Sequence, residues 1–174
     1  MNLLKNIYLF TLMNSIVYVS RDPVSFYNEY HQNYINKLIH AFCIPLIVLS
    51  IRIFTNNVIF YFRDSPYRFT RTFPFSLGRI LSNLYVVYYF TYGWFPGLVM
   101  LIYFWFIEIA HYFIDNKIPR KYFLAWCLFC FGWTMQFIGH SIEGRKPALF
   151  DSISQAFTGA PIFSMQFFFP NLLE

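Results

Sequence analysis

Charged residues are scarce in this chain of 174 residues: Asp, Glu, Lys and Arg make up 12%, whereas hydrophobic residues make up 57% and aromatic residues 24%. So few charges cannot cover an ordinary soluble domain, and the mean hydropathy of +0.44 is typical of an integral membrane protein. Because each membrane span needs about 20 residues, we predict an all-α fold. Residues 1–174 are expected to form a single membrane domain with about four to five transmembrane or interfacial helices.

The chain also lacks a basic stripe or a basic helix. Its 13 Lys and Arg residues give a formal net charge of +5, but they are scattered between apolar segments. This distribution argues against a nucleic-acid partner. Aromatic residues adjoin arginines at 61–63 and 67–71, which is typical of segments at headgroup depth. We therefore expect the lipid bilayer, and no nucleic acid, as a partner.

Cysteine is rare as well. Cys43, Cys127 and Cys130 are the three cysteines, and all lie in apolar segments. The odd number argues against a disulfide framework. Cys127-x-x-Cys130 lacks the flanking sequence of a redox motif, so we expect these residues to pack as small hydrophobes.

The first 30 residues are expected to form an interfacial lead-in rather than a cleaved signal peptide. Asn14 interrupts their apolar run, and no small-residue cleavage site follows it. Asp22-Pro23 is a helix start signal, which predicts a short polar helix over residues 25–30.

Residues 35–169 are expected to form the helical bundle. A turn at 93–97 should join two helices into an antiparallel hairpin, and residues 63–79, with four arginines, should run along the interface. The expected helices are 35–51 (with a bend at Pro45), 80–92, 98–115, 122–142 and 149–169 (broken at Gly159-Ala160-Pro161).

Three of these helices carry polar residues spaced i, i+3, i+7, which gathers each set into a narrow arc of the helix surface. Polar groups are costly at bilayer depth, so such stripes should face the bundle interior or a wet cavity. We therefore expect the three stripes to meet. They are Asn33, Asn36 and His40; Glu108, His111 and Asp115; and Trp133, Gln136 and His140, extended by Glu143.

The chain has four histidines, and three of them belong to these stripes. Imidazole suits iron, copper, zinc and nickel, and facing helices of a bundle commonly donate such ligands inward. Neighbouring amides and carboxylates can orient the rings or take part in catalysis. The candidate metal ligands are thus His31, His40, His111 and His140, and the candidate catalytic residues are Asn36, Gln136 and Glu143.

Helix geometry restricts this site. His31 and His40 would lie on opposite faces of one unbroken helix, so the helix should begin near Asn33. His111 should lie about 20 Å along its own helix from the expected side of His140, so it joins only if that helix tilts or re-enters. Each histidine could instead make an interhelical hydrogen bond or contact headgroups.

Two motifs resemble the Mpo-type 2-hydroxy fatty acid dioxygenase family. The first is Y-H-x-N-x-x-N-x-x-I-H over residues 30–40, with Pro45 beyond it. The second is G-W-x-x-Q-F-I-G-H-x-x-E-x-R-x-P-A-L-x-D over residues 132–151. The resemblance extends from about Phe26 to Phe168, and between the motifs it rests mainly on hydropathy.

This resemblance implies a multi-pass protein of the endoplasmic reticulum membrane with Fe(2+) as its cofactor. It implies that molecular oxygen cleaves 2-hydroxy fatty acids from phytosphingosine breakdown, leaving an acid one carbon shorter. His31, His40 and His140 occupy the histidine motifs, whereas the sequence around His111 matches poorly. Iron(II) with open positions can bind a 2-hydroxy carboxylate through two oxygens. The candidate substrate-binding residues are Arg145, Lys146 and Trp133, the first two by their charge.

Other functions stay open. A haem protein needs only two axial histidines from facing helices, and a non-enzymatic lipid-binding or scaffold protein would use its histidines for packing alone. Membrane di-iron hydroxylases need about eight histidines, more than this chain has. The orientation is also open: the charge bias favours a cytosolic side at residues 63–79 and 117–121, whereas the resemblance implies that the motif ends are cytosolic.

Overall fold

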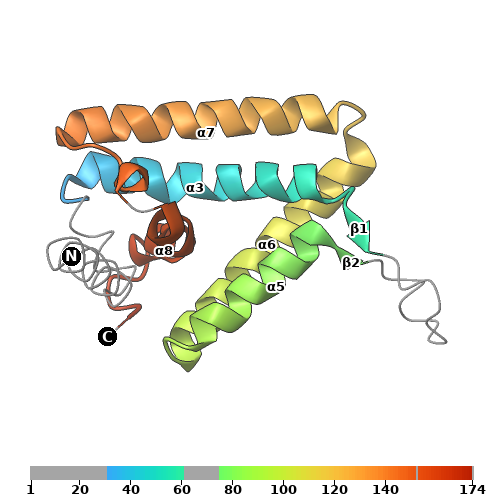
Figure 1. Ribbon diagram of the computed structural model, residues 1–174, viewed down its shortest axis with the longest axis horizontal. Coiled ribbons are helices and arrows are strands. Elements are labelled where there is room, and N and C mark those ends of the chain that lie inside the picture. Colours follow the sequence, from blue (N-terminus) through green and yellow to red (C-terminus); the bar gives the residue numbers. More distant parts are fainter. Residues whose placement is uncertain (1–30, 61–74, 152, 174) are drawn as a thin grey trace, which may run out of the picture.

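The computed structural model describes residues 31–60, 75–151 and 153–173, and their regular structure is almost entirely helical (Figure 1). Three of the described helices are long and apolar enough to cross a membrane: α3 (Tyr34–Thr55), α6 (Trp94–Lys117) and α7 (Lys121–Glu143). Two shorter helices, α5 (Leu77–Phe90) and α8 (Ile153–Gln166), and the 3-10 turn η1 (Ala148–Phe150) complete them. The predicted all-α membrane bundle is therefore confirmed. The predicted lead-in over 1–30 and most of the 63–79 connection lie outside the described residues.

A short β ladder precedes α5 and was not predicted. β1 (Ile59–Phe60) pairs antiparallel with β2 (Phe75–Ser76). Two residues per strand are too few for a visible alternation of apolar and polar residues. The ladder places Ser76 as the N-cap of α5, where its hydroxyl accepts a hydrogen bond from the Arg79 amide.

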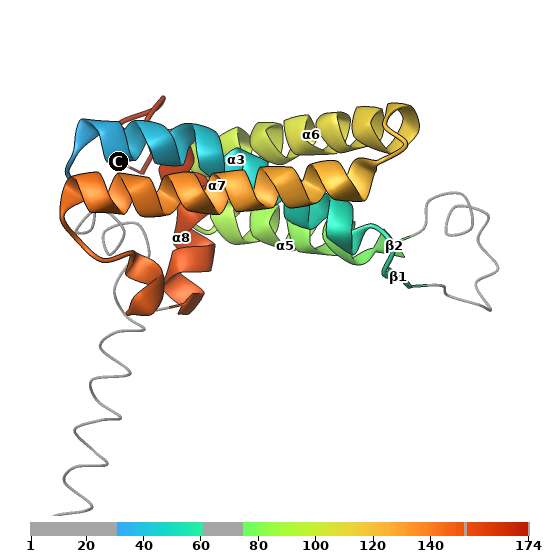
Figure 2. The same ribbon diagram turned by 90° about the horizontal axis from the view of Figure 1, so that it is seen from above.

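Helices α3 and α7 form a closely packed antiparallel pair, which lies side by side in both ribbon views (Figures 1 and 2). Glycine on α7 permits the close approach. A Cβ atom at Gly132 would lie 2.6 Å from Cγ1 of Ile47, and one at Gly139 would overlap the Asn36 side chain. Small residues at such crossings are typical of membrane helix pairs.

The predicted hairpin of α5 and α6 is present and extends away from α3 (Figure 1). Its turn is only a few residues long, because Gly93 has a φ of 131° that other residues rarely adopt. The hydrophobic core lies where this hairpin meets α3 and α8 and includes Ile53, Tyr89 and Met100.

The predicted break at Gly159-Ala160-Pro161 was wrong, because α8 continues through Pro161. A proline in a helix leaves the carbonyl four residues earlier without its usual N–H partner. Here that carbonyl, on Phe157, accepts a hydrogen bond from the Tyr85 hydroxyl (3.2 Å), and the next one, on Thr158, accepts one from Tyr89 (2.6 Å). Two tyrosines of α5 therefore satisfy the backbone of α8 and dock the two helices together.

Candidate metal centre and cavity

Three buried histidines meet where α3, α7 and the chain before α3 come together. His31, His40 and His140 are 0%, 1% and 5% exposed, and one ring nitrogen of each lies within 4.8 Å of the others. The Nε2 atoms of His31 and His40 are 2.9 Å apart. These residues come from three separate segments of the chain, so their meeting depends on the tertiary fold.

The local structure before α3 brings His31 to His40. Asn33 is the N-cap of α3, and its side chain accepts a hydrogen bond from the Ile35 amide (2.8 Å). The helix thus begins at Tyr34, as predicted, and His31 lies outside it. The chain direction before the cap then allows His31 to reach the ring of His40, which lies about 1.7 turns into α3.

The orientation of His40 is set by its own helix. Its Nδ1 lies 2.9 Å from the carbonyl oxygen of Asn36, so Nδ1 donates its proton there. The lone pair of Nε2 then points at the histidine cluster, which is the arrangement found in metal-binding histidines. The carbonyl of Asn36 is therefore an orienting group.

The donor set fits a single non-haem metal ion. A metal bound to imidazole nitrogens at about 2.1 Å brings adjacent ligand atoms to about 3 Å from each other, close to the Nε2 separation in His31 and His40. Three neutral imidazoles leave further coordination positions for other ligands. A haem needs its axial rings on opposite sides of a macrocycle, and ring centroids 4.3 to 5.1 Å apart leave no room for one between these rings.

Glu143 ties the segment carrying His31 to the end of α7. Its carboxylate accepts hydrogen bonds from the backbone amides of Gln32 (2.8 Å) and Asn33 (2.9 Å), and from the amide side chain of Asn36 (3.1 Å). A carboxylate at the start of a helix is also favoured by the helix dipole. These contacts hold the backbone next to His31, which gives Glu143 a positioning role.

The third polar stripe does not reach the histidine cluster, which corrects the expectation that all three stripes meet. Glu108 forms a bidentate ion pair with Arg52 near the other end of α3. Arg52 lies twelve residues beyond His40, or about 18 Å along the helix. His111 is on the same face of α6 as Glu108, and the described histidines that could share an ion do not include it.

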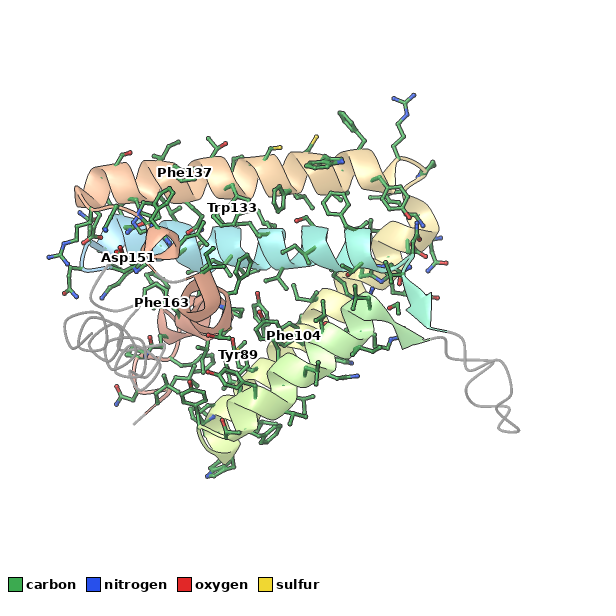
Figure 3. All side chains as sticks on the ribbon, in the orientation of Figure 1. Tyr89, Phe104, Trp133, Phe137, Asp151 and Phe163 are labelled. Carbon is green, nitrogen blue, oxygen red and sulfur yellow. The ribbon has the colours of Figure 1, made fainter. Side chains whose placement is uncertain are left out.

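A cavity of about 310 Å³ opens beside the histidine cluster and runs along α3. Most of its wall is apolar, with contributions from α5, α6, α7 and α8. Figure 3 shows Trp133 and Phe137 on α7 and Phe104 on the hairpin. The wall includes His40, Ile44, Ile47, Val48 and Ile51 of α3, Leu81, Ser82 and Tyr85 of α5, Phe104 of α6, Trp133, Gln136, Phe137 and His140 of α7, and Phe157, Ala160 and Pro161 of α8.

Three nitrogens on α7 have no hydrogen-bond partner within the described part of the chain. They are Nε1 of Trp133, Nε2 of Gln136 and Nδ1 of His140. All three side chains line the cavity, and Gln136 is only 6% exposed. A buried donor without a partner is costly, so this arrangement indicates a polar ligand at the histidine end of the cavity.

Of the three predicted substrate-binding residues, Trp133 lines the cavity and the other two do not. Arg145 and Lys146 are exposed and do not line the cavity. The Lys146 ammonium forms an ion pair with Asp151 (2.6 Å), and Pro147 and Leu149, which lie between them in the sequence, line the cavity.

One neighbour of the histidine cluster was not predicted. The ring of Phe163 on α8 lies 4.8 Å from that of His31 and 6.0 Å from that of His40, centroid to centroid. Phe163 therefore shields the cluster from that side. It lies in an aromatic-rich segment without polar periodicity, so no sequence signal marks it.

Comparison with known proteins agrees with this geometry. The yeast Saccharomyces cerevisiae has a protein named 2-hydroxy-palmitic acid dioxygenase MPO1, which is 31% identical over 146 residues, covering 83% of this chain and 76% of the yeast protein. No solved structure matches the chain. The family described as 2-hydroxy-palmitic acid dioxygenase Mpo1-like matches residues 19–172, which include all the histidines and the whole cavity wall. The chain therefore belongs to the Mpo1-like 2-hydroxy-palmitic acid dioxygenase family.

Proposed function

We propose that this protein is an iron(II)-dependent dioxygenase of the endoplasmic reticulum membrane that shortens 2-hydroxy fatty acids by one carbon in sphingoid base breakdown. One observation carries the proposal: a buried trio of histidines lies at the end of an apolar cavity, in a chain of a dioxygenase family. The apolar cavity wall suits an acyl chain, and the histidine end suits its polar head.

The proposed reaction needs no further co-substrate. The bond between C1 and C2 of the acid breaks, C2 becomes the new carboxyl carbon, and C1 leaves as carbon dioxide. The acid loses four electrons, which reduce one molecule of oxygen, and water accounts for the remaining oxygen atom and protons. Iron(II) held by His31, His40 and His140 would supply the activation of oxygen. His111 has no part in this proposal, because it lies with the distant Arg52 and Glu108 pair.

The residues of the chain bind and orient the acid. Gln136, one turn from His140 on α7, and Trp133, nearly one turn further, present unpartnered N–H groups to the cavity, where they can donate to the carboxylate or the 2-hydroxyl group. Ile44, Ile47 and the other apolar residues of the wall exclude water from the tail. Arg145 and Lys146 contribute at most by attracting the acid to the membrane surface, since neither lines the cavity.

Replacing Gln136 by leucine should raise KM for a 2-hydroxy acid about 10- to 150-fold, because one buried hydrogen bond to a charged group is worth about 1.5 to 3 kcal/mol. The side chain keeps its size, and bound iron should not change. Turnover and metal content of the purified protein measure both quantities. If this variant loses iron, Gln136 supports the metal site and not substrate binding.

Replacing Glu143 by glutamine should weaken iron binding about 10- to 100-fold, because the His31 segment loses the charged partner of two backbone amides. Titration of the apoprotein with iron(II) under anaerobic conditions measures the affinity. Asp115→Asn is the matched control, since Asp115 pairs with Lys121 at the other end of α7. Equal affinities in the two variants would refute the positioning role.

The proposed function is tested by feeding a 2-hydroxy fatty acid labelled at C1 and C2 to membranes that contain the protein. We expect the C2 label in an acid one carbon shorter and the C1 label in carbon dioxide, with oxygen consumed in equal amount. Membranes with a His40→Ala variant serve as the control. If labelled acid is recovered unchanged while the wild-type protein holds iron, the proposal is wrong.

A further inference from the structure

The cavity has two chemically different ends, joined by one face of α3. His40 stands at one end and Thr55 at the other, fifteen residues apart, which corresponds to about 22 Å along the helix axis. From Ile44 to Ile51 the side chains on this face are apolar, and the charged Arg52 follows beside Thr55 at the far end. An acyl chain lying along α3 with its head at the histidines would therefore extend its tail toward Thr55.

The far end is closed by the crossing of α3 and α5. A Cβ atom at Gly78 would lie 2.5 Å from Oγ1 of Thr55 and 3.0 Å from Cδ of Arg52, so the α5 backbone touches α3 here. Arg52 cannot easily withdraw, because Glu108 and Asn56 hold its guanidinium from the other side. This end of the cavity is thus a fixed barrier.

Ser82 lies on α5 one turn after Gly78 in the sequence, on the cavity side of that barrier. It lines the cavity, is 8% exposed, and donates its hydroxyl to the carbonyl of Gly78 (3.0 Å). Because the hydroxyl is satisfied by its own helix, Ser82 offers the cavity only a small side chain. The space beside it is available to whatever the cavity holds.

We infer that Ser82, together with the crossing at Gly78 and Thr55, sets the longest acyl chain that the cavity accepts. This inference rests on the proposed function for the placement of the head group. Each methylene of the tail that is buried contributes about 0.8 kcal/mol, and one that meets the barrier contributes nothing or clashes. The chain-length preference is therefore set at the end of the cavity that lies opposite to the histidine cluster.

The test compares Ser82→Leu with the wild-type protein on 2-hydroxy lauric, palmitic and stearic acids. We expect the ratio of kcat/KM for stearic over lauric acid to fall about tenfold or more, with iron content unchanged. Ser82→Val should give a smaller shift in the same direction. Asn83→Leu introduces the same leucine side chain at an exposed neighbouring position outside the cavity and should leave the ratio unchanged.

Displacement of a fluorescent fatty acid by unreactive saturated acids of the same lengths separates this inference from the proposed function. If neither protein oxidises any acid but Ser82→Leu still weakens binding of the longer acids, the proposed reaction fails and the length limit stands. If both Ser82 variants keep the wild-type length profile in turnover and in binding, the inference is overturned.

Discussion

Replacing His40 by alanine is expected to abolish iron binding and to lower product formation by more than about a hundredfold. His40 is buried, its Nε2 lies 2.9 Å from that of His31, and its other nitrogen is held by the Asn36 carbonyl. Loss of a single orienting partner of a metal ligand already costs about 10- to 100-fold, so loss of the ligand itself should cost at least as much. Iron analysis of the purified protein and turnover of a 2-hydroxy acid measure the two effects.

His111→Ala is the matched control for this experiment. It removes another buried histidine, but one that lies on α6 apart from the three that could share an ion. Iron content should stay at the wild-type level, whatever the change in thermal stability. If His111→Ala loses iron and His40→Ala retains it, the histidine cluster is not the metal site.

Replacing Glu108 by alanine is expected to destabilise the protein by about 3 kcal/mol or more. Arg52 is 2% exposed and Glu108 only 28%, so the variant leaves an arginine buried without its bidentate carboxylate. A charge of this kind inside a membrane helix bundle has no water to compensate it. Equilibrium unfolding in detergent micelles measures the loss.

Two further variants test whether the loss of stability comes from a buried unpaired charge or only from the removal of a charge. Asp115 lies on the same face of α6 as Glu108, and its ion pair with Lys121 of α7 is more exposed. Asp115→Ala breaks this pair and should lower the free energy of unfolding by less than about 1 kcal/mol. The double variant Arg52→Met with Glu108→Leu removes both charges and should recover most of the lost stability. If Glu108→Ala costs no more than Asp115→Ala, the Arg52 pair does not stabilise the fold.

The histidine end of the molecule was largely predictable because two polar stripes and a helix cap leave clear signals in the sequence. The i, i+3, i+7 spacing identified the faces of α3 and α7 that meet, and Asn33 marked the turn that frees His31. Periodicity, however, gives only the angular position of a residue around its helix. It does not give the depth at which another helix crosses, so the expectation that all three stripes meet was wrong. The helix length, however, had already indicated that His111 lies about 20 Å from the side of His140 unless its helix tilts.

The walls of the cavity were not predictable from local signals. Leu81, Tyr85 and Ala160 line it only because the α5 and α6 hairpin and α8 converge on α3. The continuity of α8 also depends on partners distant in sequence, since Tyr85 supplies the hydrogen bond that Pro161 removes. Proline rules describe an isolated helix, and here another helix compensates for the missing donor.

One helix, α3, carries His40 near its beginning and Arg52 near its end. Substitutions separated by more than about 10 Å and sharing no partners usually have additive effects. On the proposed function and length limit, changes beside Arg52, Gly78 and Ser82 would alter the lipids that are accepted and leave the histidine cluster intact. Selectivity and reactivity would evolve as separate traits on one scaffold.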